Sequence, residues 1–455
     1  MNRRKFSLTA AVLLAMTPLG WFLTGSTPLH AQTWTLRQCI DYALENNIQL
    51  QQSKITTQQN ELDLKQSKAA LFPSLSASIN QNMSWRPYSL STINLTNGTM
   101  TSTESKLTYN GSYGLNASWT VWNGGKNTKN IKQNKYNTEM SELATEVSAN
   151  SIQEQITQLY IQILYQKEAV EVNNEILKAS IQQKERAQVM LNVGSIARAD
   201  YAQLDAQAAQ DEYNLVNSQA QLDNYKFQLK QLLELTGSED FDIAGANAGE
   251  DKVMQLIPGK DEVYRTAVTT RPEIKKSQLN IESSDLAVSI AKTGYLPQVN
   301  LNASIGTSNS SGMDTSFGTQ IKNNLSNSLG LSLSIPIFDQ SQNRTSIRKA
   351  KLTKKNSELE LQETEKELYK SIENYWLNAT TSQQQYKYAK TNAESMKESY
   401  DLLSEQFKVG LKNIVELTTG KNNLLQAEQQ KLQSKYNTLY NLAMLRFYQG
   451  EGIEL

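Results

Sequence analysis

Apolar and polar residues alternate strictly in four short stretches of the chain, at 75–79, 113–121, 299–305 and 329–337. In the last stretch Leu329, Leu331 and Leu333 alternate with glycine and serine. Period-two alternation with one apolar face predicts half-buried antiparallel strands. The polar faces carry small uncharged side chains, as a water-filled lumen prefers, and stretches of about 10 residues suit tilted membrane strands. The pattern favours a membrane β-barrel over a sheet packed on its own helices.

Four strands are too few for a membrane barrel, whose smallest known form has about 8 strands. Open strand edges are not tolerated in lipid, so several copies of the chain must pool their strands. Two copies would give a barrel filled by its own side chains, whereas a duct needs a wider ring. We therefore expect a homotrimer with a 12-stranded barrel.

Helix-period segments far longer than those of globular proteins follow the strands. Residues 126–192 contain neither proline nor glycine, which predicts one helix of about 100 Å. In 197–235, apolar residues recur in steps of four and three, which is typical of coiled coils. The fold is therefore expected to be mainly α, with antiparallel coiled-coil helices forming an α-helical barrel. Glutamine and asparagine fill many remaining positions, and these could face water outside or inside a tube.

The chain repeats itself at a nearly constant spacing. Pro73 and Pro297 follow similar helices, and Gly194 and Gly410 interrupt similar long helical segments. The order of the motifs is kept, which predicts a tandem duplication with repeats at 32–236 and 261–449. Residues 237–260 are expected to be an equatorial linker, and residues 450–455 a C-terminal tail.

The first 31 residues have the features of a secretory signal peptide. A basic start at 3–5 precedes an apolar run at 6–23, and small residues end at Ala31. A membrane anchor is the alternative, but Pro18 and Gly20 favour cleavage. The whole chain has 45 basic and 45 acidic residues without a basic block, so there is no electrostatic argument for binding nucleic acid.

Two residue types that carry chemistry are almost missing. His30 is the only histidine and lies in the predicted signal peptide, while Cys39 is the only cysteine. Histidine is the commonest general base and metal ligand, and one thiol forms neither an internal disulfide nor a cysteine-rich metal site. Cys39 shares an apolar helix face with Leu36 and Ile40, where we expect it to be buried. We therefore predict no enzyme activity, no metal site and no cofactor.

Two long helices meeting at a Val-Gly pair, twice per chain and each time after a strand pair, resemble the TolC-type outer-membrane efflux family. The resemblance covers essentially the whole chain after the predicted signal peptide. It is carried by the opening helix 36–47, Phe72-Pro73, Leu296-Pro297, the corner at 122–125 and the turns at 192–200 and 408–416.

The resemblance implies a homotrimer in the outer membrane, with helices extending into the periplasm. Such a duct conducts substrates passively in a tripartite efflux or type I secretion system. A periplasmic adaptor (membrane fusion) protein and an inner-membrane transporter would be its partners. Selectivity would lie mainly in the transporter, so the sequence of the duct does not identify the exported substrate.

The two glycine turns are the expected docking sites of the adaptor. A sharp helix reversal commonly needs a residue with positive φ, which explains the glycines without any partner. The family adds adaptor docking on the same turns. The expected docking residues are Leu191, Val193, Gly194, Val409, Gly410 and Leu411.

The resemblance also implies a gate at the periplasmic entrance. Glu416 matches a family position that forms an acidic ring around the axis, and Lys412 would link to Asp200 of a neighbouring helix pair. Thr419 stands where the family has a second acid, so the ring would carry half the charge. The alternative is that Lys412 and Glu416 are ordinary solvated surface charges.

Two other classes of protein remain as alternatives. A coiled-coil structural or adhesin-like surface protein with a β-sheet anchor explains the helices, but not strands between duplicated helix pairs. A secreted enzyme is disfavoured by the lack of histidine and of any catalytic motif.

Overall fold

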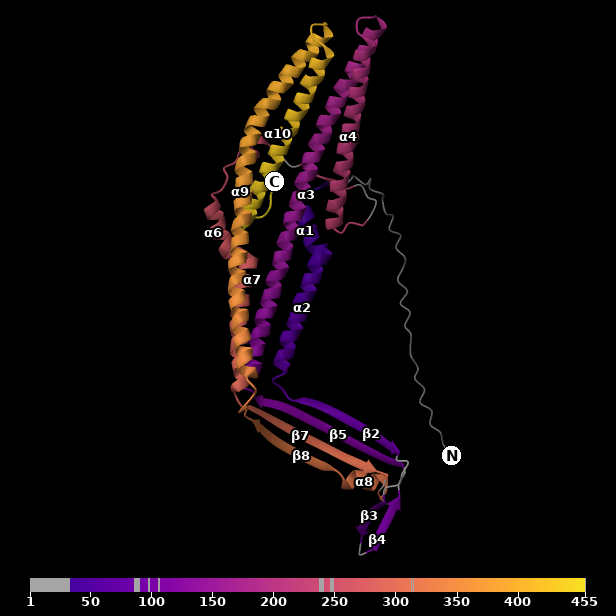
Figure 1. The fold of residues 1–455 in the computed structure, drawn as a ribbon, viewed down its shortest axis with the longest axis vertical. Helices are drawn as coiled ribbons and strands as arrows, with labels where there is room; N and C mark the ends of the chain where they lie inside the picture. The colour runs from indigo at the N-terminus through magenta and orange to yellow at the C-terminus, as the bar shows by residue number, and fades with distance from the viewer. Residues whose placement is uncertain are drawn as a thin grey trace, which may run out of the picture.

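The computed structural model describes residues 33–85, 91–96, 99–104, 107–236, 241–245, 249–311, 313 and 315–454. The predicted signal peptide at 1–31 lies outside these residues. A long helical body meets a strand region at one end (Figure 1). None of the described helices is long and apolar enough to cross a membrane.

Two helical hairpins form the greater part of the body. In the first, α3 (Lys126–Asn192) turns into α4 (Arg198–Leu232). In the second, α9 (Gln342–Lys408) turns into α10 (Ile414–Tyr448). Each hairpin joins a helix of 67 residues to one of 35 residues. The unbroken helix predicted over 126–192 is confirmed, because no proline or glycine interrupts its backbone hydrogen bonds.

The shorter helices repeat as the long ones do. Helices α1 (Leu36–Asn46) and α2 (Ile48–Ala69) correspond to α6 (Lys260–Thr270) and α7 (Pro272–Lys292), whose first residues follow at an offset of 224. The bounds of both long helices repeat at an offset of 216, as Lys126 and Gln342 show. The difference of eight arises in the connections between the paired strands, which are shorter in the second half.

Four antiparallel strands form the sheet, in the order β2 (Ser74–Trp85), β5 (Leu107–Trp122), β7 (Gln298–Ser310) and β8 (Ser326–Ser334). The register of the strand pairs places the apolar positions of the four alternating stretches opposite one another. Ala117 faces Ala303, which faces Leu329 across the next pair. Directly opposed residues share a face. The apolar residues of all four strands therefore form one face, and the serine and asparagine residues form the other.

Most of the apolar face of this sheet is exposed, and only its far end packs on a helix, where Phe317 contacts Tyr113. Leu75 is 76% exposed and Leu331 is 70% exposed, and the helices meet the sheet at its end instead of lying across its faces (Figure 1). A sheet packed on its own helices would bury these leucines. The structure thus disagrees with that alternative and leaves an apolar surface that requires a partner of its own.

Smaller elements lie in the strand connections. A hairpin of β3 (Ser91–Thr96) and β4 (Thr99–Glu104) lies beyond β2 and β5, and α8 (Phe317–Asn323) lies between β7 and β8 (Figure 1). A 3-10 turn, η1 (Thr293–Tyr295), ends α7. The sequence pattern predicted only polar loops in these connections.

The main hydrophobic core lies around the middle of the body, where α1 and α6 pack on the long helices. Strand β1 (Thr33–Trp34) pairs with β6 (Asp242–Ile243), and Tyr160 donates a hydrogen bond to the Ala244 carbonyl at 2.7 Å. A short helix, α5 (Glu250–Val253), follows in the connecting segment. Cys39 is fully buried there, as predicted, and burial raises the pKa of its thiol to about 12.

Candidate functional site

The two helix turns farthest from the sheet have the same backbone geometry. Gly194 has φ of 77° and Gly410 has φ of 76°. The Ser195 N–H donates to the Met190 carbonyl at 2.9 Å, and the Leu411 N–H donates to the Gln406 carbonyl at 3.0 Å. This bond across six residues is the Schellman termination of a helix. Apart from each glycine's own chain neighbours, no described atom lies within 4 Å of the position that a Cβ would take, so the positive φ alone selects glycine.

Large apolar side chains surround both glycines and face solvent. Val193 is 74% exposed, Val409 is 70% exposed and Leu411 is 75% exposed, while Leu191 is half-buried. Exposed apolar residues gathered at the ends of two neighbouring hairpins form a candidate protein-binding surface. We call these residues, with the two glycines, the tip surface.

The charged residues predicted to form a gate lie at the start of α10 and α4. Lys412 Nζ lies 2.6 Å from Glu416 Oε1, and both side chains are partly exposed. Glu416 Oε2 accepts the Asn413 N–H at 3.2 Å, and Asn413 Oδ1 accepts the Glu416 N–H at 2.9 Å, which completes a capping box. The hydrogen bond from Lys412, followed by that from the Asn413 backbone, lowers the pKa of Glu416.

Asp200 occupies the corresponding position of the first hairpin. Its Oδ2 accepts the Ala197 N–H at 3.3 Å at the start of α4. Within the chain the structure brings Lys412 to Glu416 and does not pair it with Asp200, because Lys412 directly precedes the N-cap of α10 and Glu416 lies in the first turn of that helix. A link from Lys412 to Asp200 across neighbouring chains stays a prediction.

A buried ion pair, which the sequence analysis did not identify, joins the two hairpins below the tips. Lys421 of α10 contacts the Asp211 carboxylate of α4, with side chains 1% and 3% exposed. Lys421 also donates to Ser180 Oγ of α3 at 2.9 Å, and Ser180 donates to Asp211 Oδ2 at 2.6 Å. Gln207 donates to Asp211 Oδ1 at 3.1 Å. Burial lowers the pKa of Lys421, and the hydrogen bond with Asp211 opposes this shift.

Sequence signals for this pair did exist. Lys421 lies between Leu417 and Leu424 on the buried face of α10, and Asp211 follows the buried Leu204 and Ala208 on α4. A charge in a coiled-coil core position is unfavourable unless it has a partner. That the two charges meet, however, follows only from the three-dimensional fold.

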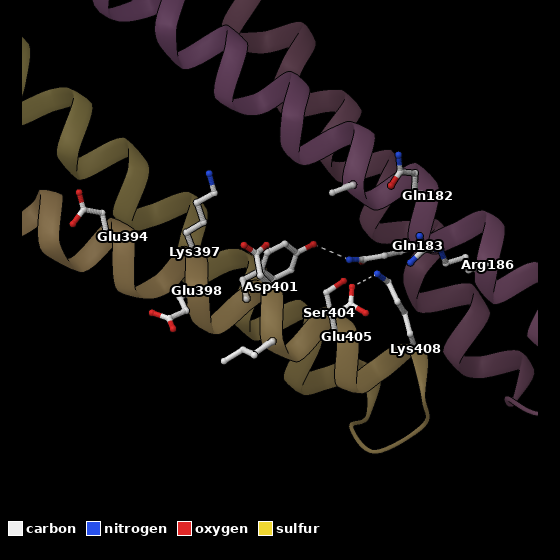
Figure 2. A pocket seen from close by; sticks show the side chains of 13 residues that line it. Gln182, Gln183, Arg186, Glu394, Lys397, Glu398, Asp401, Ser404, Glu405 and Lys408 are labelled. Carbon is white, nitrogen blue, oxygen red and sulfur yellow. Dashed lines mark hydrogen bonds and ion pairs between the residues drawn. The ribbon is translucent and has the colours of Figure 1, made fainter. Parts of the chain in front are cut away.

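A second polar bridge connects α3 to α9 beside a cleft of about 680 Å³ (Figure 2). Gln183 Nε2 donates to Tyr400 Oη at 2.7 Å, and burial raises the pKa of Tyr400. Charged side chains line the cleft, and Figure 2 shows Lys408 pointing toward Glu405, its ion-pair partner. Toward the tips the two hairpins separate (Figure 1). The Tyr400 and Lys421 bridges connect the two hairpins, and nearer the tips Ala187 and Leu204 of the first hairpin pack against Ile414 of the second.

Known proteins resemble this chain over much of its length. TolC of Escherichia coli is 26% identical over 273 residues, which cover 58% of this chain and 54% of TolC. The chain thus spans about half the length of that relative. The outer membrane efflux protein BepC of Brucella suis is 20% identical over 442 residues, covering 95% of this chain and 87% of BepC.

The fold also matches a solved outer membrane channel. CmeC of Campylobacter jejuni superposes with a TM-score of 0.73 at 19% identity, covering 92% of this chain and 87% of CmeC. At this identity the match shows the fold alone.

A family model supplies the assignment. The model described as "Outer membrane efflux protein" matches residues 39–234 and 263–451, one segment in each half of the chain. These segments include both hairpins and all four strands of the main sheet. The protein is accordingly an outer-membrane protein whose helices extend into the periplasm. The chain belongs to the outer membrane efflux protein family.

Proposed function

We propose that this chain is one subunit of a passive exit duct in a tripartite efflux or type I secretion system. The observation that carries the proposal is the sheet with a largely exposed apolar face at the end of two long hairpins. Lipid covers that face, and the helices extend the duct through the periplasm. The duct performs no chemistry, so the energy for transport comes from an inner-membrane transporter.

The open edges of the sheet support a trimer. Strands β2 and β8 have one neighbour each, and an unpaired strand edge is not tolerated in lipid. Three copies give 12 strands, with β8 of one chain pairing with β2 of the next. Eight strands from two copies would enclose a space filled by side chains.

The helices offer matching surfaces for such a trimer. On α2, which continues into β2, the residues Ile48, Ile55 and Leu62 follow a seven-residue repeat and are exposed. On α9, which follows β8, Leu352 and Leu359 are exposed with the same spacing. Coiled-coil packing of α2 on the α9 of a neighbouring chain would bury both stripes where the strands close the barrel.

The tip surface is the docking site for a periplasmic adaptor protein in this proposal. Its exposed valines and leucine would be buried in the complex, while Gly194 and Gly410 keep the turns tight. The gate lies close by. In the closed trimer Glu416 contributes to an acidic ring. Lys412, which pairs with Glu416 within one chain, pairs there with Asp200 of a neighbouring chain instead.

Extraction and conductance test the proposal together. The purified protein should need detergent, run as a heat-modifiable trimer and form channels in planar bilayers. Leu331→Arg, on the apolar face, should lower the yield of trimer, whereas Ser332→Arg, on the polar face, should leave it unchanged. A protein that extracts in buffer without detergent would contradict the duct and favour a coiled-coil surface fibre.

The proposed link from Lys412 to Asp200 of a neighbouring chain requires its own test. Lys412→Ala combined with Asp200→Ala should raise the conductance of single channels if the two residues link neighbouring chains. The control is Lys355→Ala, which removes an exposed ion pair far from the tips. Unchanged conductance in the double variant would rule out the link between Lys412 and Asp200, but it would not contradict the proposal that the protein forms a duct.

A further inference from the structure

Positive charge concentrates where the helices adjoin the sheet. We define the collar as the segments 61–70, 126–135, 285–294 and 342–351, which end α2, start α3, end α7 and start α9. Figure 1 shows these four helix ends meeting the sheet at one level. The collar contains eleven basic and three acidic residues, a net charge of +8 in a chain that is neutral overall. Its basic residues are Lys65, Lys68, Lys126, Lys129, Lys132, Lys135, Lys292, Arg344, Arg348, Lys349 and Lys351.

These charges are not neutralised by the described parts of the chain. Of the collar's basic residues, only Lys135 forms an ion pair with another described residue, Glu139 at 3.4 Å. Lys129 donates to the Ser289 carbonyl at 3.2 Å, and the other side chains are exposed. The acidic Asp285 pairs with Lys354, outside the collar. The collar therefore presents a largely unpaired positive surface.

The opposite ends of the long helices serve as an internal comparison. The four ten-residue segments next to the tips, 183–192, 198–207, 399–408 and 414–423, contain five basic and six acidic residues. The excess at the collar is thus local and not a property of these helices in general.

Helix direction adds to the positive potential of the collar. The first turns of α3 and α9 contain no acidic residue, whereas Asp200 and Glu416 occupy the first turns of α4 and α10. A helix N-terminus carries partial positive charge and favours a nearby anion. Lys126 and Arg344 repel these N-termini unless anions from outside the chain lie between them.

Aromatic residues mark the depth of the collar relative to lipid. Phe72, Trp122, Tyr295 and Phe338 are all exposed in the connections between the sheet and the four helices. Aromatic side chains at the ends of barrel strands gather at the membrane interface. The collar begins directly beyond them and spans about 15 Å of helix. The headgroup layer and one Debye length of about 8 Å cover this distance.

We propose that the collar binds the anionic headgroups of phospholipids in the periplasmic leaflet of the outer membrane. The inference rests on the outer-membrane placement of the sheet, and it adds a specific lipid partner to the duct. Bound headgroups would neutralise the collar and hold the barrel at a fixed depth. Each basic residue near an anionic surface strengthens binding by about fivefold at low salt.

Quenching of tryptophan fluorescence by brominated lipids tests the collar in the full-length, reconstituted protein. Trp119 and Trp122 lie beside the collar and report on lipids bound there. Brominated phosphatidylglycerol should quench several-fold more strongly than brominated phosphatidylcholine at low salt, and high salt should abolish this preference. The variant Lys126→Gln, Lys349→Gln, Lys351→Gln should remove most or all of this several-fold preference, because each lost charge weakens binding to an anionic surface by about fivefold.

The matched control removes the same charge from α9 at a distance from the sheet. Lys366→Gln, Lys387→Gln, Lys397→Gln should leave the lipid preference unchanged. Equal quenching of the wild-type protein by both lipids would overturn the proposal, as would an unchanged preference in the collar variant. If the collar variant altered only the anion-to-cation permeability ratio, its bases would line the lumen, and the lipid proposal would be wrong. Absence of quenching by either lipid would instead contradict the membrane placement itself.

Discussion

Replacing Lys421 with methionine would remove the charge from one member of the buried ion pair and keep most of the side chain's volume. Asp211 would then keep its hydrogen bonds from Ser180 and Gln207 but lose its only cationic partner among the described residues. Breaking a buried pair by removing one partner typically costs about 3–5 kcal/mol, because an uncompensated charge stays buried. The substitution should therefore loosen the junction between the hairpins.

The size of the effect follows from the chemistry of the remaining carboxylate. A carboxylate without a counterion in a dry site avoids the penalty by taking up a proton. Protonating a carboxyl group of ordinary acidity costs about 4 kcal/mol at pH 7 and about 1.5 kcal/mol at pH 5, and these values are the upper limits of the penalty. The destabilisation caused by Lys421→Met should therefore shrink as the pH falls.

Native-state hydrogen exchange measures this local stability in the intact protein. Amides of α10 around residue 421 should exchange up to about a thousandfold faster than wild type at pH 7 and only about tenfold faster at pH 5, after correction for intrinsic rates. Lys421→Met with Asp211→Leu removes both charges and should return exchange to within about tenfold of wild type. Lys178→Met, which breaks an exposed pair on α3, is the control and should have little effect. Equal acceleration by the single and double variants, or an effect independent of pH, would refute a buried uncompensated charge.

Three further predictions concern the tips and the sheet. Gly410→Ala should destabilise the second tip by about 1–2 kcal/mol, seen as faster trypsin cleavage after Lys408, because the positive φ is strained for alanine although its Cβ meets no atom. Glu416 has a lowered pKa, so its capping bonds should be complete above pH 4.5 and be lost as the pH falls through its folded-state pKa. A conductance change in that acidic range should be absent in Glu416→Gln. Leu331→Arg should cost about 2–4 kcal/mol near mid-membrane, and the yield of heat-modifiable trimer measures this loss.

Much of the fold follows from local signals in the sequence. Helices α2 and α7 end at Ala69 and Lys292, a few residues before Pro73 and Pro297, because the residue before a proline is disfavoured in the helical conformation. The alternation determines which side chains of each strand share a face, because a shift by one residue would mix apolar and polar side chains. It does not distinguish registers that differ by two residues. By contrast, α8 is too short for its periodicity to be recognised, and the β3–β4 hairpin consists largely of polar residues.

The candidate site was less predictable than the fold. The glycine turns follow from their local requirement for positive φ, but the charges depend on which helices meet. Lys412 and Glu416 have the spacing of an intrahelical pair, and this local partner is the one found within the chain. Lys421 and Asp211 lie 210 residues apart, so only the packing of α4 on its neighbours brings them together. Sequence periodicity indicates that each charge is buried, without identifying its partner.

The distribution of polar and apolar contacts explains how one body could be rigid at its middle and movable at its tips. Around the middle of the body the helices share an extensive apolar core. Separating these helices would expose a large apolar surface to water. Nearer the tips the apolar clusters are small, and the bridges from Gln183 to Tyr400 and from Lys421 to Asp211 connect the hairpins. When a polar bridge separates, both partners form hydrogen bonds with water instead. Breaking these bridges therefore costs less free energy than separating an apolar core of equal size. We infer that opening of the duct separates the hairpins from the tips down to the Lys421–Asp211 pair and leaves the equatorial core intact.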